Sequence, residues 1–200
     1  MEGLDDLNTL KKVLTQLLSP DNSARKQAEA QLNQAVVNNP KKLVTCLVSI
    51  LEGSQTQTST LCGILLKKVF SPESNYEAWS KLTQSTQELV KHQLLNLVQN
   101  CESKHLPEAV ALLASNIFQT GSSWSEFNTF MQTNLKPGST YSAPAVEAYT
   151  YLPVYLVKEF SDLESLLHLL LSSQNPSTRL LALKAMKLFF RAQESLNSQS

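Results

Sequence analysis

Few side chains in this sequence could do chemistry together. The three histidines (His92, His105 and His168) are far apart in the chain, and Cys101 stands four residues before His105. That spacing can place two metal ligands on one face of a helix, but a zinc site needs three or four ligands and no second pair accompanies this one. No orienting acid or amide marks a Cys–His nucleophile, and the sequence contains no glycine-rich phosphate-binding motif. We therefore expect no metal site, no cofactor and no enzymatic activity.

The charged residues that could bind a partner fall into two groups. Lys67 and Lys68 form the sharpest basic pair on a predicted helix, although basic residues near a helix C-terminus also suit the helix dipole without binding anything. Arg25, Lys26 and Glu29 lie on another predicted helix, where Arg25 and Glu29 have the spacing of an intrahelical ion pair. From the residues alone, a binding role and a structural role both stay open for each group.

The composition is what we expect of a soluble intracellular protein. The chain has 200 residues, with 17 basic and 17 acidic side chains and no net charge, so there is no electrostatic argument for nucleic acid or an anionic membrane. No apolar window is long enough to span a membrane, and the N-terminus is acidic where a signal peptide would be basic. Three cysteines, an odd number, favour a reducing compartment over a disulfide scaffold.

Helical periodicity dominates the sequence, and strand signals are nearly absent. Apolar residues recur at i, i+3 and i+4, and prolines and short polar loops separate the periodic segments. About ten helices result, and the first helices of successive pairs start 36 to 47 residues apart, roughly the period of HEAT-type hairpins. We predict an all-α HEAT-repeat (armadillo-like) solenoid of about five hairpins, followed by a polar tail at 194–200. The hairpins are expected at about 4–39, 40–71, 76–120, 123–159 and 161–193.

The second predicted helix carries unusually little apolar volume. It begins after the turn and cap candidates Asp21, Asn22 and Ser23, yet its inward positions hold Ala24 and Ala28. A helix squeezed between its partner and the neighbouring repeats needs small residues, because they let the backbones approach. We expect Trp79 and Trp124 to pack between helices and not to serve as platforms for a ligand.

Five motifs, in order along the chain, resemble the N-terminal repeats of importin-β-type nuclear transport receptors. They are most similar to the importin-beta-3-like karyopherins, which import ribosomal proteins and histones. The motifs are residues 17–22 with 25–29, residues 61–68, Trp124, Pro153 and residues 175–180. Members of this family are several times longer, so the resemblance implies a fragment or a shortened relative. A generic HEAT-repeat scaffold for another cytosolic assembly is the alternative.

The resemblance implies partners that composition cannot identify. In this family the inner helices of the N-terminal hairpins bind the small GTPase Ran in its GTP form, which makes Arg25, Lys26, Glu29, Lys67 and Lys68 candidate Ran-binding residues. Outer helices bind Phe-Gly nucleoporins, for which the apolar helix bearing Leu166, Leu167 and Leu170 is a candidate groove. That apolar face could instead pack against a further hairpin. We expect a monomer that shuttles between cytoplasm and nucleus and holds protein cargo mostly through repeats outside this sequence.

Overall fold

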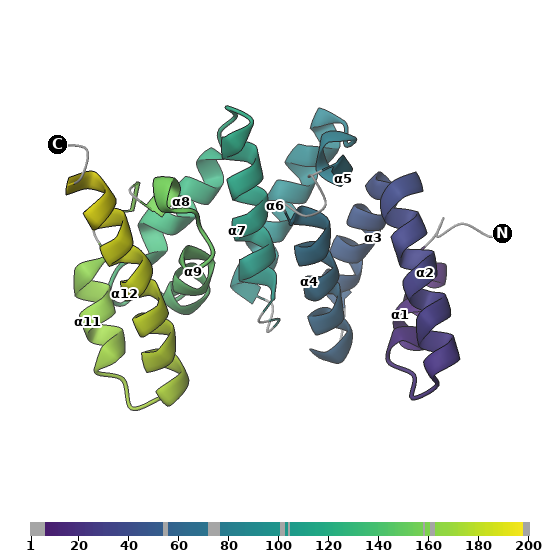
Figure 1. Ribbon diagram of the computed structural model, residues 1–200, viewed down its shortest axis with the longest axis horizontal. Coiled ribbons are helices and arrows are strands. Elements are labelled where there is room, and N and C mark those ends of the chain that lie inside the picture. The colour runs from purple at the N-terminus through teal and green to yellow at the C-terminus, as the bar shows by residue number, and fades with distance from the viewer. Residues whose placement is uncertain are drawn as a thin grey trace. The chain divides into compact units, whose positions relative to one another are not determined.

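The chain is all-α in the part that the computed structural model describes, which is residues 7–53, 56–71, 77–100, 103, 105–157, 159–160 and 163–197. Figure 1 shows these helices in the order of the chain. They form two compact units, Met1–Ala109 and Val110–Ser200. Within each unit consecutive helices pack as pairs joined by short loops. The all-α class and the helical-repeat architecture expected from the sequence are confirmed.

The first unit contains two helical pairs and the helices that follow them. The pairs are α1 (Leu7–Leu17) with α2 (Asn22–Asn38), and α3 (Pro40–Gly53) with α4 (Thr56–Phe70). A short α5 (Glu77–Ser80) and α6 (Gln84–Asn100) both pack against α3. The next helix, α7 (Leu106–Gln119), begins in the first unit and continues into the second.

The small residues of α2 do what the sequence analysis expects of them. Asp21 caps the helix by accepting a hydrogen bond from the backbone N–H of Ser23 at 2.8 Å, which satisfies one of the free N–H groups of the first turn. Ala28 is completely buried, and Leu32 and Ala35 are also buried. Since α2 contacts both α1 and α3, the alanine side chain lets three helices pack closely. The prediction of a tightly packed second helix is confirmed.

The second unit is built from shorter helices and one long one. It contains α8 (Ser125–Asn134), α9 (Ser142–Tyr149), α10 (Val154–Val157), α11 (Glu164–Leu171) and α12 (Pro176–Asn197). Pro153 lies between α9 and α10, as expected of a residue that lacks the N–H needed inside a helix. The long α12 packs against α9, α10 and α11, so a single helix contacts three others of this unit.

One expected helix end changes, and the expected role of the tryptophans is confirmed. The last helix continues to Asn197, beyond the end at 193 expected for the last hairpin, and residues 198–200 lie outside the described residues. Helix propensity explains the difference, because this segment contains neither glycine nor proline. Both tryptophans are buried and in contact with phenylalanines, Trp79 with Phe70 and Trp124 with Phe127. They are packing residues, as predicted.

Candidate partner-binding site

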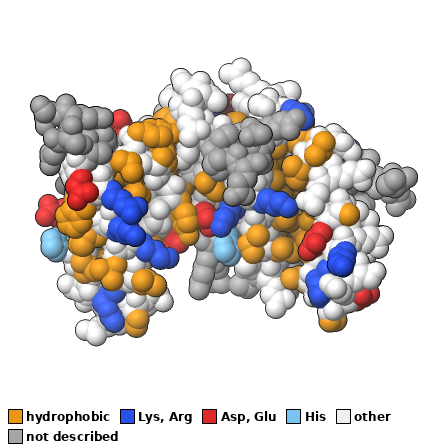
Figure 2. Space-filling view, in the orientation of Figure 1, with side chains coloured by type: hydrophobic (Ala, Val, Ile, Leu, Met, Phe, Trp, Pro, Cys, Tyr) orange, Lys and Arg blue, Asp and Glu red, His pale blue; other side chains and the backbone are white. Residues whose placement is uncertain are grey.

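An open apolar groove lies between α2 and α4 in the first unit. Its volume is about 260 Å³. Figure 2 shows hydrophobic side chains gathered over these two helices, with charged side chains at their edges. We call it the α2–α4 groove; it is lined by Leu17, Glu29, Leu32, Asn33, Val36, Leu43, Leu61, Leu65, Lys68 and Val69. Leu61 also borders a second, shallower hollow beside Leu18 and Ile64, both of which are exposed. This surface can receive apolar side chains of a partner.

Of the predicted binding residues, the structure brings Glu29 and Lys68 together at this groove. Lys68 is exposed, and its Nζ donates a hydrogen bond of 3.0 Å to Oδ1 of Asn33 on the opposite wall. That bond spans the groove without neutralising the ammonium charge. Lys26 is exposed on α2 and does not line the groove. Lys68 is therefore the cation best placed to meet a carboxylate of a partner that enters the groove.

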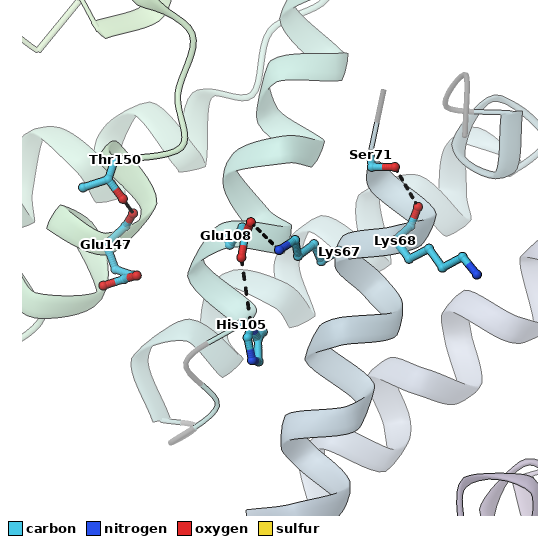
Figure 3. A network of polar contacts seen from close by, with 7 residues as sticks. All are labelled: Lys67, Lys68, Ser71, His105, Glu108, Glu147 and Thr150. Carbon is cyan, nitrogen blue, oxygen red and sulfur yellow. Dashed lines mark hydrogen bonds and ion pairs between the residues drawn. The ribbon is translucent and has the colours of Figure 1, made fainter. Parts of the chain in front are cut away.

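Lys67 is engaged inside the protein. Its Nζ lies 2.7 Å from Oε1 of Glu108 at the start of α7, and the Glu108 side chain is only 10% exposed. Nδ1 of His105 lies 3.9 Å from the other carboxylate oxygen. Figure 3 shows Lys67 and His105 both directed at Glu108, while Lys68 points away. Removing Lys67 would leave a nearly buried carboxylate without its closest cation, so this lysine joins α4 to α7 and is a poor candidate for a partner contact.

Arg25 also has a structural role. Its Nη1 donates to the backbone carbonyls of Ser19 at 2.7 Å and Pro20 at 3.0 Å, and its Nη2 donates to Oδ1 of Asn22 at 3.2 Å. The planar guanidinium can hold several acceptors at once in this way. The intrahelical ion pair with Glu29 does not form; the arginine closes the α1–α2 loop instead. We call this arrangement the arginine loop clamp.

The second unit contains the same clamp, which the sequence analysis misses. Nη1 of Arg179 donates to the carbonyls of Ser173 at 2.8 Å and Gln174 at 3.0 Å in the α11–α12 loop. Asn175 accepts from the N–H of Ser177 at 2.9 Å, as Asp21 does from Ser23. The signal is present in the sequence: Ser19, Asp21, Ser23 and Arg25 recur with the same spacing as Ser173, Asn175, Ser177 and Arg179.

The predicted nucleoporin groove on α11 does not form from the residues proposed for it. Leu166 and Leu167 are each 1% exposed, and α11 packs against α12. Leu170 is half-buried, and the exposed leucine of this helix is Leu169. Packing within the unit accounts for Leu166 and Leu167. The assignment of Leu166 and Leu167 to an open groove is therefore wrong.

The remaining candidates for chemistry are not brought together. Among the described residues no group of three His, Cys, Asp or Glu side chains could hold a metal ion, and Cys101 lies outside them. Cys46 and Cys62 are in no disulfide. None of the described helices is both long enough and apolar enough to cross a membrane.

Comparison with known proteins adds little to this picture. No family model matches the chain, and no curated protein matches it. A designed armadillo repeat protein, solved in complex with the peptide (KR)4, is 13% identical at a TM-score of 0.30, over 90% of this chain and 99% of its own. A second engineered protein is 12% identical at a TM-score of 0.29, over 90% of this chain and 98% of its own. Values this low carry no argument about function.

Proposed function

We propose that this chain is the N-terminal region of a nuclear transport receptor of the importin-β type, and that its first unit binds Ran in the GTP form. The observation that supports this is the α2–α4 groove. Its walls are the second helices of the first two hairpins, the positions that the resemblance identifies as inner, Ran-binding helices. In this proposal the protein shuttles between cytoplasm and nucleus.

The groove supplies two kinds of contact. Its apolar lining contributes about 25 cal/mol of binding free energy for each Å² of apolar surface that binding removes from water. Lys68 can exchange its neutral acceptor, Asn33 Oδ1, for a carboxylate of the partner, whose negative charge adds a Coulomb attraction that the amide lacks. Arg25 and Lys67 have no part in this proposal, since both are engaged within the fold.

Binding assays with Ran loaded with a non-hydrolysable GTP analogue, or with GDP, test the proposal. We expect binding only to the GTP form, and a loss of about tenfold in affinity for Lys68→Glu, because charge reversal at a partner contact costs at least about 1.4 kcal/mol. Lys41→Glu is the matched control, since Lys41 is exposed on α3 and does not line the groove. Equal binding to both nucleotide forms, or none, would exclude the transport function.

The alternative is a HEAT-repeat scaffold for another cytosolic assembly. It is favoured by the internal engagement of two of the five predicted Ran-binding residues, Arg25 and Lys67. The same experiment separates the two. A scaffold would show no preference for the nucleotide state of Ran, and charge reversal at Lys68 would leave any Ran binding unchanged.

A further inference from the structure

The outward face of α12 carries large apolar side chains that the described helices leave exposed. Leu180, Leu183 and Phe190 are 56%, 54% and 54% exposed. At about 100° per residue these three positions lie within roughly 80° of one another around the helix. The Phe190 ring contacts the ring of its neighbour Phe189 with a centroid distance of 5.9 Å.

A row of cations runs beside these apolar residues. Lys184, Lys187 and Arg191 are exposed and pair with no acidic side chain among the described residues. The helix has no acidic residue before Glu194. Figure 2 shows basic and hydrophobic side chains next to one another along α12. We call Leu180, Leu183, Lys184, Lys187, Phe190 and Arg191 the α12 outer stripe. Arg179 is not part of it, because its guanidinium closes the preceding loop.

The opposite side of α12 is fixed in the core. Ala182 and Ala185 are completely buried and Ala192 is 3% exposed, and the helix packs against α9, α10 and α11. The outer stripe is therefore held on a rigid element. From residue 180 to residue 191 it spans about 16 Å, since a helix rises 1.5 Å per residue.

We propose that the α12 outer stripe binds an acidic amphipathic helix of a partner protein. The partner's apolar residues, at i, i+3, i+4 and i+7, would contact Leu180, Leu183 and Phe190. Its flanking carboxylates would pair with Lys184, Lys187 and Arg191, which supply the complementary charge. A helix of three to four turns, about 14 residues, matches the length of the stripe.

The stripe fits a protein partner better than an anionic lipid surface. A helix that lies in a membrane interface has a broad apolar face separate from its basic one. In α12 Lys187 lies between Leu180 and Leu183 around the helix, so the apolar positions form no separate broad face, and the opposite side of the helix is buried. This inference does not depend on Ran, because its residues all lie in the second unit.

The test uses the full chain and a fluorescein-labelled peptide of about 14 residues, with leucines at i, i+3, i+4 and i+7 and glutamates on the flanks. Fluorescence anisotropy should detect binding that weakens with added salt. We expect the triple variant Lys184→Glu, Lys187→Glu, Arg191→Glu to weaken it by roughly tenfold or more, since three ion pairs become repulsive. The matched control reverses three exposed lysines elsewhere, Lys12, Lys41 and Lys136, and should bind as the parent chain does.

A second variant and two further measurements keep the outcomes distinct. Leu183→Ser with Phe190→Ser changes exposed side chains only, so it should fold normally and lose the peptide. Equal binding of a peptide with lysines in place of the glutamates would overturn the proposal. Absence of peptide binding would also overturn it. A dimer in sedimentation that this variant abolishes would instead assign the stripe to a second copy, and binding to vesicles of phosphatidylcholine and phosphatidylserine that it abolishes would assign the stripe to a lipid surface.

Discussion

Replacing Arg25 separates a structural role from a binding role at a residue that the family resemblance makes a candidate Ran contact. In Arg25→Ala the carbonyls of Ser19 and Pro20 and the side chain of Asn22 lose their donor. Those acceptors are exposed or partly buried, so water replaces much of what is lost. A hydrogen bond to a charged group contributes about 1.5–3 kcal/mol when it is sheltered, and less where solvent screens it. We expect a total loss of about 1–2 kcal/mol of unfolding free energy.

The measurement is thermal and urea denaturation followed by circular dichroism. For a domain of roughly this size, a loss of 1–2 kcal/mol lowers the melting temperature by about 2–8 °C. Arg179→Ala removes the equivalent clamp and should show a loss of similar size. Lys26→Ala is the neighbouring control, because Lys26 is exposed, and it should change stability by less than about 0.5 kcal/mol.

Stability and Ran binding of Arg25→Ala, measured together, distinguish the two roles of this residue. If Arg25→Ala keeps the parent stability and weakens binding to Ran in the GTP form at low temperature, the arginine is a contact residue and the clamp is incidental. If it lowers stability and binds Ran normally while folded, the clamp accounts for the residue. Arg25→Lys refines the result, since a lysine ammonium lacks the planar fork that holds two carbonyls together, and we expect about half of the alanine effect.

Substitutions at three further positions test buried contacts within the two units. Desolvation raises the pKa of the buried Tyr149 phenol, so the phenol stays protonated in the folded protein, whereas in the unfolded chain it ionises near pH 10. The unfolding free energy should therefore be constant below about pH 10 and fall by about 1.4 kcal/mol per pH unit above it. Tyr149→Phe should flatten this fall in urea titrations. A Cβ at Gly63 would lie 2.6 Å from Oγ of Ser103, so Gly63→Ala should lower the melting temperature by several degrees, with partial recovery on adding Ser103→Ala. Lys67→Met should lower the free energy of unfolding by about 1–3 kcal/mol in urea denaturation, because the nearly buried carboxylate of Glu108 loses its closest cation. Combining Lys67→Met with Glu108→Gln should recover most of that loss.

The helices could be predicted from the sequence because their signals are local. Pro40 begins α3, Pro153 separates α9 from α10, and Asp21 caps α2, and each of these acts through the backbone of its own residue or the next few. The end of α12 was harder to predict. A polar sequence without glycine or proline has no clear stop signal, and the helix continues to Asn197.

The binding residues could not be selected from the sequence because their partners are distant along the chain. Nothing near Lys67 indicates that Glu108 will lie 2.7 Å away, and nothing near Leu166 indicates that α12 will cover it. Lys67 and Lys68 are adjacent and chemically identical, yet one pairs with the nearly buried carboxylate of Glu108 and the other lines a groove. Only tertiary packing distinguishes them. Arg25 is different, since its clamp is local and its repeat at Arg179 was available as a sequence signal.

The difference between cations engaged within the fold and cations left exposed gives a criterion for locating partner-binding sites on a helical-repeat protein. A cation that the fold already uses, as in the two clamps and the Lys67–Glu108 pair, must first break an internal contact before it can bind anything, and that cost lowers affinity. A cation exposed beside apolar side chains, with at most a neutral acceptor to exchange, loses less on binding and gains more from a carboxylate that is partly removed from water. Two places among the described residues meet this criterion best: Lys68 at the α2–α4 groove, whose one acceptor is a neutral amide, and the α12 outer stripe. Because they lie in different units, charge reversal in one should leave binding at the other unchanged, and measuring both affinities in each variant would show whether the chain presents two independent sites.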